Sequence, residues 1–168
     1  MDAKHPLFVY LPCGVGGAPG GITYGLKQML GDNVHCFFAE PVQAPCFTLG
    51  MATGEHSNIS VYDIGLSGKT IADGLAVGRA SGLVCRVMDE IVSGSFTTED
   101  DALLQYQKAL EESEGIFVEP SACAGFHGVM NLQDSDEFKK YIADNNLEEY
   151  MDNASHIVWA TGGGLMPR

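Results

Sequence analysis

The sequence predicts an α/β protein with a mainly parallel sheet flanked by helices. Short apolar runs that favour β-structure alternate along the chain with amphipathic segments of helical periodicity. Glycine-rich loops follow two of these runs, at the points where a strand would end. Such alternation is typical of strand–helix–strand units, whose strands pair in parallel. Because the chain has 168 residues and no internal repeat or linker, we expect residues 1–168 to form a single domain.

The expected strands are short and rich in apolar, β-favouring side chains. They lie at residues 6–12, 34–41, 58–65, 115–120 and 156–164. The first two are almost continuously apolar, which indicates strands that are buried on both faces of a parallel sheet.

The expected helices lie between these strands, at residues 20–30, 45–52, 81–92, 97–115, from 121 onward, and 135–154 as one or two acidic helices. Gly31 and Gly54 would end the first two, because glycine adopts the left-handed cap conformation without strain. Three glycines interrupt residues 70–92, so we expect a loop there before a helix that starts near Ser81.

The segment 97–115 carries the clearest helical pattern. Thr97 or Thr98 can cap it, and acidic residues in its first turn complement the helix dipole. The expected buried side consists of Leu103, Leu104, Tyr106 and Leu110.

Charge and cysteine usage exclude several classes of protein. The formal net charge of −13 argues against a nucleic-acid or anionic-membrane surface, but backbone N–H groups can still bind a small anion. No apolar run approaches the length of a membrane span, and the start "MDAKH" lacks the features of a signal peptide. Five cysteines without a C-x-x-C pair indicate reduced thiols, so we expect a cytoplasmic protein.

Four features are expected to meet at the carboxyl ends of the parallel strands, where ligands bind in such sheets. They are the glycine loop after Pro12, Glu40 with Pro41, Glu119 with Pro120, and Thr161 with the glycines 162–164. Glu119 also fits the first turn of a helix, where an acid interacts favourably with the helix dipole.

The loop "LPCGVGGAPGG", residues 11–21, has the composition of a phosphate-binding turn. A P-loop is excluded because Ile22 stands where that motif requires lysine. A dinucleotide fingerprint could start at Gly14, but Pro19 takes the place of its third glycine. Two interpretations remain, namely a nest of N–H groups around one phosphate and a tight turn without a ligand. The second loop, "WATGGG", favours the first of them because it offers a hydroxyl and open backbone nearby.

Five segments in the same order resemble the bacterial D-serine dehydratase (D-serine ammonia-lyase) family. They are "LPCGVGGAPGG" (11–21), "HCFFAEP" (35–41), "ADGLAVGRASG" (72–82), "EPSACAG" (119–125) and "VWATGGG" (158–164). This resemblance implies pyridoxal 5'-phosphate as the cofactor and the C-terminal part of the tryptophan synthase β-like fold. It implies the α,β-elimination of D-serine to pyruvate and ammonia as the reaction.

The resemblance also implies roles for individual residues. The backbone amides of the loop would hold the cofactor phosphate; they belong to Gly14, Val15, Gly16, Gly17 and Ala18. The hydroxyl of Thr161, followed by Gly162, would bond the pyridine nitrogen, and Glu40 would lie near the ring. A neutral hydroxyl does not hold that nitrogen protonated, which favours elimination over competing reactions.

Two further expectations come from the same resemblance. Glu40 and the backbone carbonyls of Ala44 and Cys46 would ligate a monovalent cation, for which hard oxygen ligands suit K⁺ or Na⁺. Ala18 stands where many family members carry glycine, so the loop would be strained if that position needed a positive φ.

The chain lacks the lysine that the family uses to attach the cofactor, so we assign it no catalytic residue. Family members are more than twice as long and carry that lysine in their N-terminal half. The lysines here follow no such motif and are expected on the surface, at positions 4, 27, 69, 108, 139 and 140.

We therefore expect a C-terminal, cofactor-binding portion that is inactive alone. Its partners would be the upstream half of the same enzyme and the small-molecule substrate. Exposed apolar edges would favour self-association. Two alternatives are a stand-alone, non-catalytic domain that binds a phosphate-bearing small molecule and, with less support, a nicotinamide dinucleotide domain.

Overall fold

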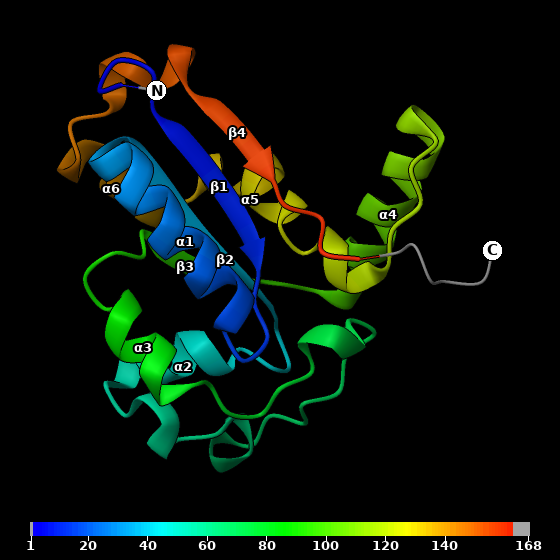
Figure 1. Cartoon of the computed structure of the whole chain (residues 1–168). Helices are drawn as coiled ribbons and strands as arrows, with labels where there is room; N and C mark the ends of the chain where they lie inside the picture. Colours follow the sequence, from blue (N-terminus) through cyan, green and yellow to red (C-terminus); the bar gives the residue numbers. More distant parts are fainter. Residues whose placement is uncertain (1, 163–168) are drawn as a thin grey trace.

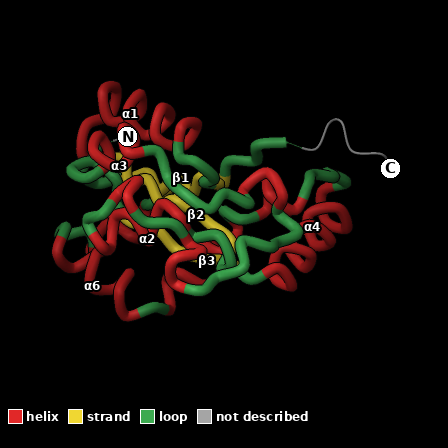
Figure 2. Tube along the Cα trace, turned by 90° about the horizontal axis from the view of Figure 1, so that it is seen from below, coloured by secondary structure: helices red, strands yellow, loops and turns green. Residues whose placement is uncertain are grey.

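A four-stranded parallel sheet of order β3-β2-β1-β4 forms the centre of the computed structural model, which describes residues 2–162 (Figure 1). The middle strands are β1 (Leu7–Pro12) and β2 (Val34–Pro41), and the edge strands are β3 (Gly94–Thr98) and β4 (Ser155–Val158). Every residue of β1 and β2 is buried, because helices cover both faces of the sheet (Figure 2). The expected α/β class with a parallel sheet is confirmed.

The helices are α1 (Gly17–Leu30), α2 (Cys46–Thr53), α3 (Gly82–Met88), α4 (Asp100–Glu114), α5 (Phe126–Asn131) and α6 (Asp136–Asp144). Short 3₁₀ turns fill most of the remaining connections. None of the helices in this described part of the chain has the length and apolar character needed to cross a bilayer.

One face of the sheet packs against α1, α2 and α3. Val9 and Leu11 of β1 and Phe38 of β2 point into this layer, and Phe47 of α2 contacts Phe38 with ring centroids 4.7 Å apart. Burying these side chains is the main favourable contribution to folding on this side of the sheet.

Aromatic side chains dominate the other face, which α5 and α6 cover. Phe8 lies between two histidine rings, with centroid distances of 4.9 Å to His35 and 5.1 Å to His156. The Tyr10 hydroxyl bonds His156 Nδ1 at 3.0 Å, and His35 Nδ1 bonds the Tyr141 hydroxyl at 2.6 Å. The buried Nε2 of His35 has no hydrogen-bond partner among the described residues.

Several expected elements are placed differently by the structure. The first helix starts at Gly17 rather than near Gly20, because Pro19 in the first turn needs no N–H partner. The strand expected at 58–65 is wrong, since Ser60 and Asp63 form a capping box that starts a 3₁₀ turn. The strand expected at 115–120 is also wrong, because Gly115 ends α4 in the left-handed conformation and the next residues pair with no strand among those described.

The strand β3 was not expected, and it changes the assignment of its neighbours. Thr97 and Thr98 belong to β3 rather than to a helix cap, so α4 begins at Asp100 after Glu99. Of the four residues expected on the buried side of α4, Leu103 is fully buried, whereas Leu104 is 48% exposed.

Candidate functional site

The loops that follow the strands meet at the carboxyl edge of the sheet, toward which the arrowheads point in Figure 1. The N–H of Cys13 donates to the carbonyl of Ala39 at 2.8 Å, which joins the glycine loop to the end of β2. The N–H of Trp159 donates to the carbonyl of Tyr10 at 3.0 Å, which brings the segment after β4 to the same edge.

The glycine loop is held in one shape by the backbone and by α3. Gly16 has φ +103°, a conformation that L side chains rarely adopt, and a Cβ there would lie 3.0 Å from Val84 Cγ1. The carbonyl of Val15 accepts a hydrogen bond of 3.0 Å from the N–H of Ser81. The loop therefore turns sharply at Gly16 and leads directly into α1.

The loop presents a run of amides without acceptors. Among the described residues, no hydrogen bond uses the N–H of residues 14 to 18 as its donor, and Pro19 has no N–H. The first paired amide of α1 belongs to Gly20, which donates to the carbonyl of Gly16 at 2.9 Å. Successive free N–H groups at a helix N-terminus form a site for an anion such as phosphate.

One position in this run, Gly17, is open to an incoming group. No described atom lies within 4 Å of a Cβ built at Gly17, so the folded chain itself leaves this position open. Ala18 lies in the first turn of α1 and is not among the non-glycine residues with positive φ. The strain that an alanine at this position could have caused is therefore absent.

Two segments that are distant in the sequence, residues 72–82 and 119–125, support the loop from outside. The carbonyl oxygen of Gly74 would lie 3.2 Å from a Cβ at Gly14, so residues 72–82 pack directly on the loop. The N–H of Gly74 donates to Oγ of the buried Ser121 at 3.2 Å. Both segments, "ADGLAVGRASG" and "EPSACAG", belong to the family resemblance, but their spacing in the sequence does not show that they touch.

Glu40 is fully buried at the end of β2, and both of its carboxylate oxygens have donors. Oε1 accepts the N–H of Phe47 at 2.8 Å, and Oε2 accepts the N–H and Oγ1 of Thr48 at 2.8 and 2.6 Å. Burial raises the pKa of Glu40 to about 6, although these hydrogen bonds oppose the shift. The carboxylate therefore satisfies the N-terminus of α2 in the way that a capping side chain does.

The residues expected to ligate a cation also have partners within the chain. The carbonyl of Ala44 accepts the N–H of Cys46 at 3.0 Å. The Cys46 thiol, which is not the atom expected to bind the cation, donates to the carbonyl of Gly14 at 3.4 Å. Burial, reinforced by the charge of Glu40, raises the pKa of Cys46 to about 12. Within residues 2–162, no group of three or more His, Cys, Asp or Glu side chains could hold a metal ion. A cation on Glu40 and two carbonyls stays a prediction.

The segment after β4 brings the second polar feature to the same edge. Thr161 is exposed, and Gly162 lies so close to Glu119 that a Cβ there would overlap the carboxylate oxygen Oε1. A side chain at position 162 would require the flexible Glu119 side chain to move away. Gly163 and Gly164, which complete the expected loop, lie outside the described residues.

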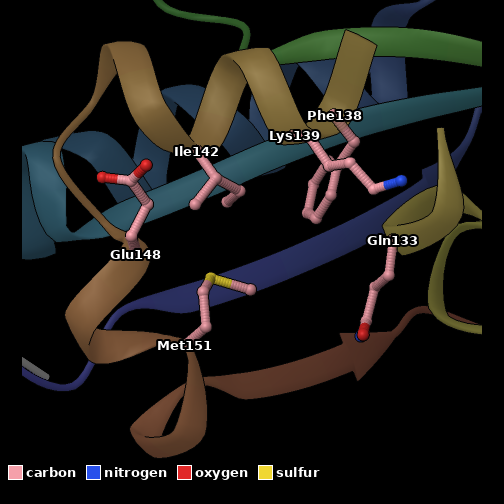
Figure 3. A pocket seen from close by; sticks show the side chains of 6 residues that line it. All are labelled: Gln133, Phe138, Lys139, Ile142, Glu148 and Met151. Atoms are coloured by element: carbon pink, nitrogen blue, oxygen red, sulfur yellow. The ribbon is translucent and has the colours of Figure 1, made fainter. Parts of the chain in front are cut away.

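Among the described residues, no hydrogen bond or ion pair joins a lysine side chain to the glycine loop. Lys108, Lys139 and Lys140 are mostly exposed, as expected. Lys27 was also expected in solvent, and this is wrong, because its side chain is 16% exposed and its Nζ lies 3.9 Å from Asp32 at the far end of α1. Lys139 borders a hollow of about 330 Å³ on the α6 side, formed by Phe138, Ile142 and Met151 among others (Figure 3).

A family model described as "Pyridoxal-phosphate dependent enzyme" matches residues 2–143. A protein named "Probable D-serine dehydratase" from Halalkalibacterium halodurans is 57% identical over 167 residues, which is 99% of this chain and 37% of that protein. One of the same name from Cupriavidus pinatubonensis is 58% identical over 168 residues and is covered to 38%. The chain thus spans less than two fifths of the length of these curated relatives.

Solved structures share the fold. Maize serine racemase matches with a TM-score of 0.69 at 25% identity, over 95% of this chain and 43% of that one. Serine racemase from Dictyostelium discoideum matches with a TM-score of 0.67 at 22% identity, over 96% and 44%. This likeness confirms the expectation that the chain adopts part of the fold of these pyridoxal-phosphate enzymes.

Replacing Glu40 by Gln should change how stability depends on pH. Because the pKa of Glu40 in the folded chain is raised to about 6, the buried carboxyl favours folding below its unfolded pKa, and this contribution is lost as pH rises through 6. The free energy of unfolding of the parent relative to Glu40→Gln should fall by about 2 kcal/mol between pH 4 and pH 7.5. Urea unfolding of both proteins at the two pH values measures this. A difference that does not change with pH would contradict the burial argument.

Proposed function

Because the chain belongs to the family of pyridoxal-phosphate dependent enzymes, we propose that it is the C-terminal, cofactor-binding portion of a D-serine ammonia-lyase. The observation that carries the proposal is the run of unpaired amides from Gly14 to Ala18, at the N-terminus of a 14-residue helix. The name of the relatives at 57% and 58% identity supports D-serine as the substrate.

The glycine loop would hold the phosphate of the cofactor without any cationic side chain. Five N–H groups without acceptors in the described chain would supply partial positive charge, and the dipole of α1 would add to it. Gly17 leaves room for the phosphate oxygens to approach the backbone. This device suits a chain whose net charge is −13, since it needs no lysine or arginine.

Thr161 would receive the other end of the cofactor. It follows β4, which pairs directly with β1, so the segment with Thr161 and the glycine loop leave neighbouring strands at one edge. The bound cofactor supplies an electron sink for the charge that develops on the substrate Cα. A hydroxyl partner leaves the pyridine nitrogen unprotonated and so keeps that sink mild. Glu119, which packs on Gly162, would fix the backbone next to Thr161.

Glu40 is proposed to act at the border of the site. Its carboxylate fixes α2 through Phe47 and Thr48, and α2 in turn places the Cys46 thiol against the carbonyl of Gly14. A K⁺ or Na⁺ ion on Glu40 and the carbonyls of Ala44 and Cys46 would neutralise the buried charge. In either case Glu40 stabilises the loop rather than reacting with substrate.

The complete enzyme would convert D-serine to pyruvate and ammonia. The substrate loses its α-proton and its hydroxyl group, and hydrolysis of the dehydrated product then releases ammonia, so no net water is consumed. The lysine that attaches the cofactor would come from the roughly three fifths of the enzyme that this chain does not span. A cytoplasmic location fits this chemistry and the five free, buried cysteines.

A stand-alone, non-catalytic domain that binds a phosphate-bearing molecule is the alternative. It is favoured by the placement of the lysines, none of which contacts the glycine loop in the described part of the chain. Treatment of this chain with pyridoxal phosphate and borohydride tests whether any of its own lysines attaches the cofactor. Stable attachment to one lysine, mapped by mass spectrometry, would overturn our assignment of that lysine to the missing part.

Turnover of D-serine should appear once the missing part is supplied. A full-length chimaera would carry this chain in place of the matching segment of the Halalkalibacterium halodurans relative, with which it is 57% identical. We expect it to form pyruvate from D-serine, measured with lactate dehydrogenase, and this chain alone to form none. L-serine serves as the control substrate. Turnover of another amino acid but not of D-serine would overturn the assignment of D-serine as the substrate.

Replacing Gly17 by Asp should weaken cofactor binding without weakening the fold. The new carboxylate would face the phosphate, and a like charge at this range lowers affinity by on the order of tenfold. The open space at Gly17 and the favourable position of an acid in the first turn of α1 should preserve the thermal midpoint. Titration with pyridoxal phosphate, read by its absorbance and fluorescence, measures the affinity.

The matched control for this experiment is Gly25→Asp, two turns further along the same helix and equally open. It should leave the affinity for pyridoxal phosphate nearly unchanged. Pyridoxal without the phosphate should bind the parent and Gly17→Asp equally weakly. Equal loss of affinity in both variants would show that the phosphate does not sit at the start of α1.

A further inference from the structure

An apolar face remains uncovered on α1 and α3, which lie side by side in both views of the chain (Figures 1 and 2). Leu83 and Val87 of α3 are 66% and 42% exposed, and Tyr24 of α1 is 52% exposed. Between the helices lies a hollow of about 430 Å³ lined by these residues and by Gly21. We call this surface, formed by Gly21, Tyr24, Leu83 and Val87, the α1–α3 face.

The outer side of α1 lacks the charges that a solvated helix normally carries. Lys27 is the only charged residue of α1, and it lies toward Asp32 rather than on this side. Helix α4, by contrast, carries six charged residues in fifteen, as expected for a helix that faces water. The composition of α1 therefore indicates a helix with a second neighbour beyond the sheet.

Two glycines on α1 agree with such a neighbour. Gly21 and Gly25 are four residues apart and share one side of the helix, and no described atom lies within 4 Å of a Cβ at either of them. Glycine weakens an exposed helix relative to alanine, so the folded chain alone gives no reason for Gly21 and Gly25. They would let another backbone approach α1 closely.

We propose that the α1–α3 face is the surface on which an apolar helix from the missing part of the same enzyme packs. This inference rests on the proposed function, since it takes the chain as a portion of a longer enzyme. The curated relatives extend well beyond this chain, which covers 37% and 38% of them, so a large body of protein is available to cover the face. The face is continuous with the glycine loop, because Val84 between its two helices also contacts Gly16.

Thiol labelling of this chain has little background, because all five of its native cysteines are buried. The chimaera without an added cysteine gives the background for the full-length protein. Leu83→Cys places a thiol on the α1–α3 face, and Leu104→Cys places the matched control on the charged helix α4. Both variants are made in this chain and in the full-length chimaera, and both are labelled with an uncharged maleimide. In the chain alone, both thiols should react at similar rates.

In the chimaera, the thiol at position 83 should react at least about tenfold more slowly, since a covered site reacts only through local opening. The thiol at position 104 should keep its rate. Equal rates at position 83 in both proteins would overturn the proposal. Slow, concentration-dependent labelling at position 83 in the chain alone would identify a second copy as the occupant and would also overturn it. If the chimaera fails to fold, the same two thiols placed at the matching positions of the relative's own enzyme give the comparison.

Pyruvate formation in the same chimaera separates this inference from the proposed function. If D-serine is turned over while the thiol at position 83 stays reactive, the result supports the proposed function and contradicts the docking surface. If the thiol at position 83 is protected but D-serine is not turned over, the result supports the docking surface and contradicts the proposed function.

Gly21→Ala supplies an independent test by the sign of its effect. In this chain the added methyl meets open space and favours the helix, so the thermal midpoint should rise. In the full-length chimaera the methyl should meet the docked helix, so the midpoint should fall. A rise in both proteins would show that nothing packs closely on α1.

Discussion

The left-handed turn at Gly16 is the constraint on which the rest of the site depends. Strand β1 is buried on both faces, so the chain can leave it only at the carboxyl edge. With φ +103° at Gly16, it turns at once into α1 and leaves the first amides of that helix facing the edge. Val84 packs against Gly16, and Ser81 bonds Val15, so the placement of α3 follows from the same turn.

Parallel strands direct two helix N-termini to this edge, and the chain treats them in opposite ways. The N-terminus of α2 receives an internal anion, since the buried carboxylate of Glu40 accepts from Phe47 and Thr48. The N-terminus of α1 has no such group, and its amides stay free. Two neighbouring helix dipoles thus share the edge. The protein neutralises one of them, and the other is the proposed site of a phosphate. Because the Glu40 carboxylate occupies the N-terminus of α2, that helix does not compete for the same anion.

The sequence predicted the elements that a local pattern determines. The bounds of β2 agree with the expected strand, and β1 differs by one residue, because continuous apolar runs between polar turns leave little choice of register. Strand β3 was missed because "GSFTT" has no such run, and its conformation comes from pairing with β2, where Phe37 lies opposite Gly94. The 58–65 segment shows the reverse case, since Ser60 and Asp63 settle a 3₁₀ turn locally despite β-favouring neighbours.

The site followed the same rule. The run of free amides at residues 14–18 was predictable, because it depends on glycines adjacent in the sequence and on the helix that follows them. The bonds from Phe47 and Thr48 to Glu40 were not, since they depend on the direction in which α2 leaves the loop after β2. The contact between Gly74 and Ser121 joins segments 47 residues apart, and only the folded chain brings them together.

The division of the chemistry between this chain and the missing part has a structural reason in α1. Lys27, the one lysine here whose side chain is mostly withdrawn from solvent, is paired with Asp32 and lies ten residues from Gly17, or roughly 15 Å along the helix. It therefore cannot serve a cofactor held at the other end. If α1 binds the phosphate with its N-terminus and the missing part with its outer side, both ligands act on one rigid helix. Ordering of the glycine loop by the cofactor phosphate would then favour docking of the missing part, and the reverse. Cofactor binding and assembly of the enzyme should therefore be thermodynamically linked.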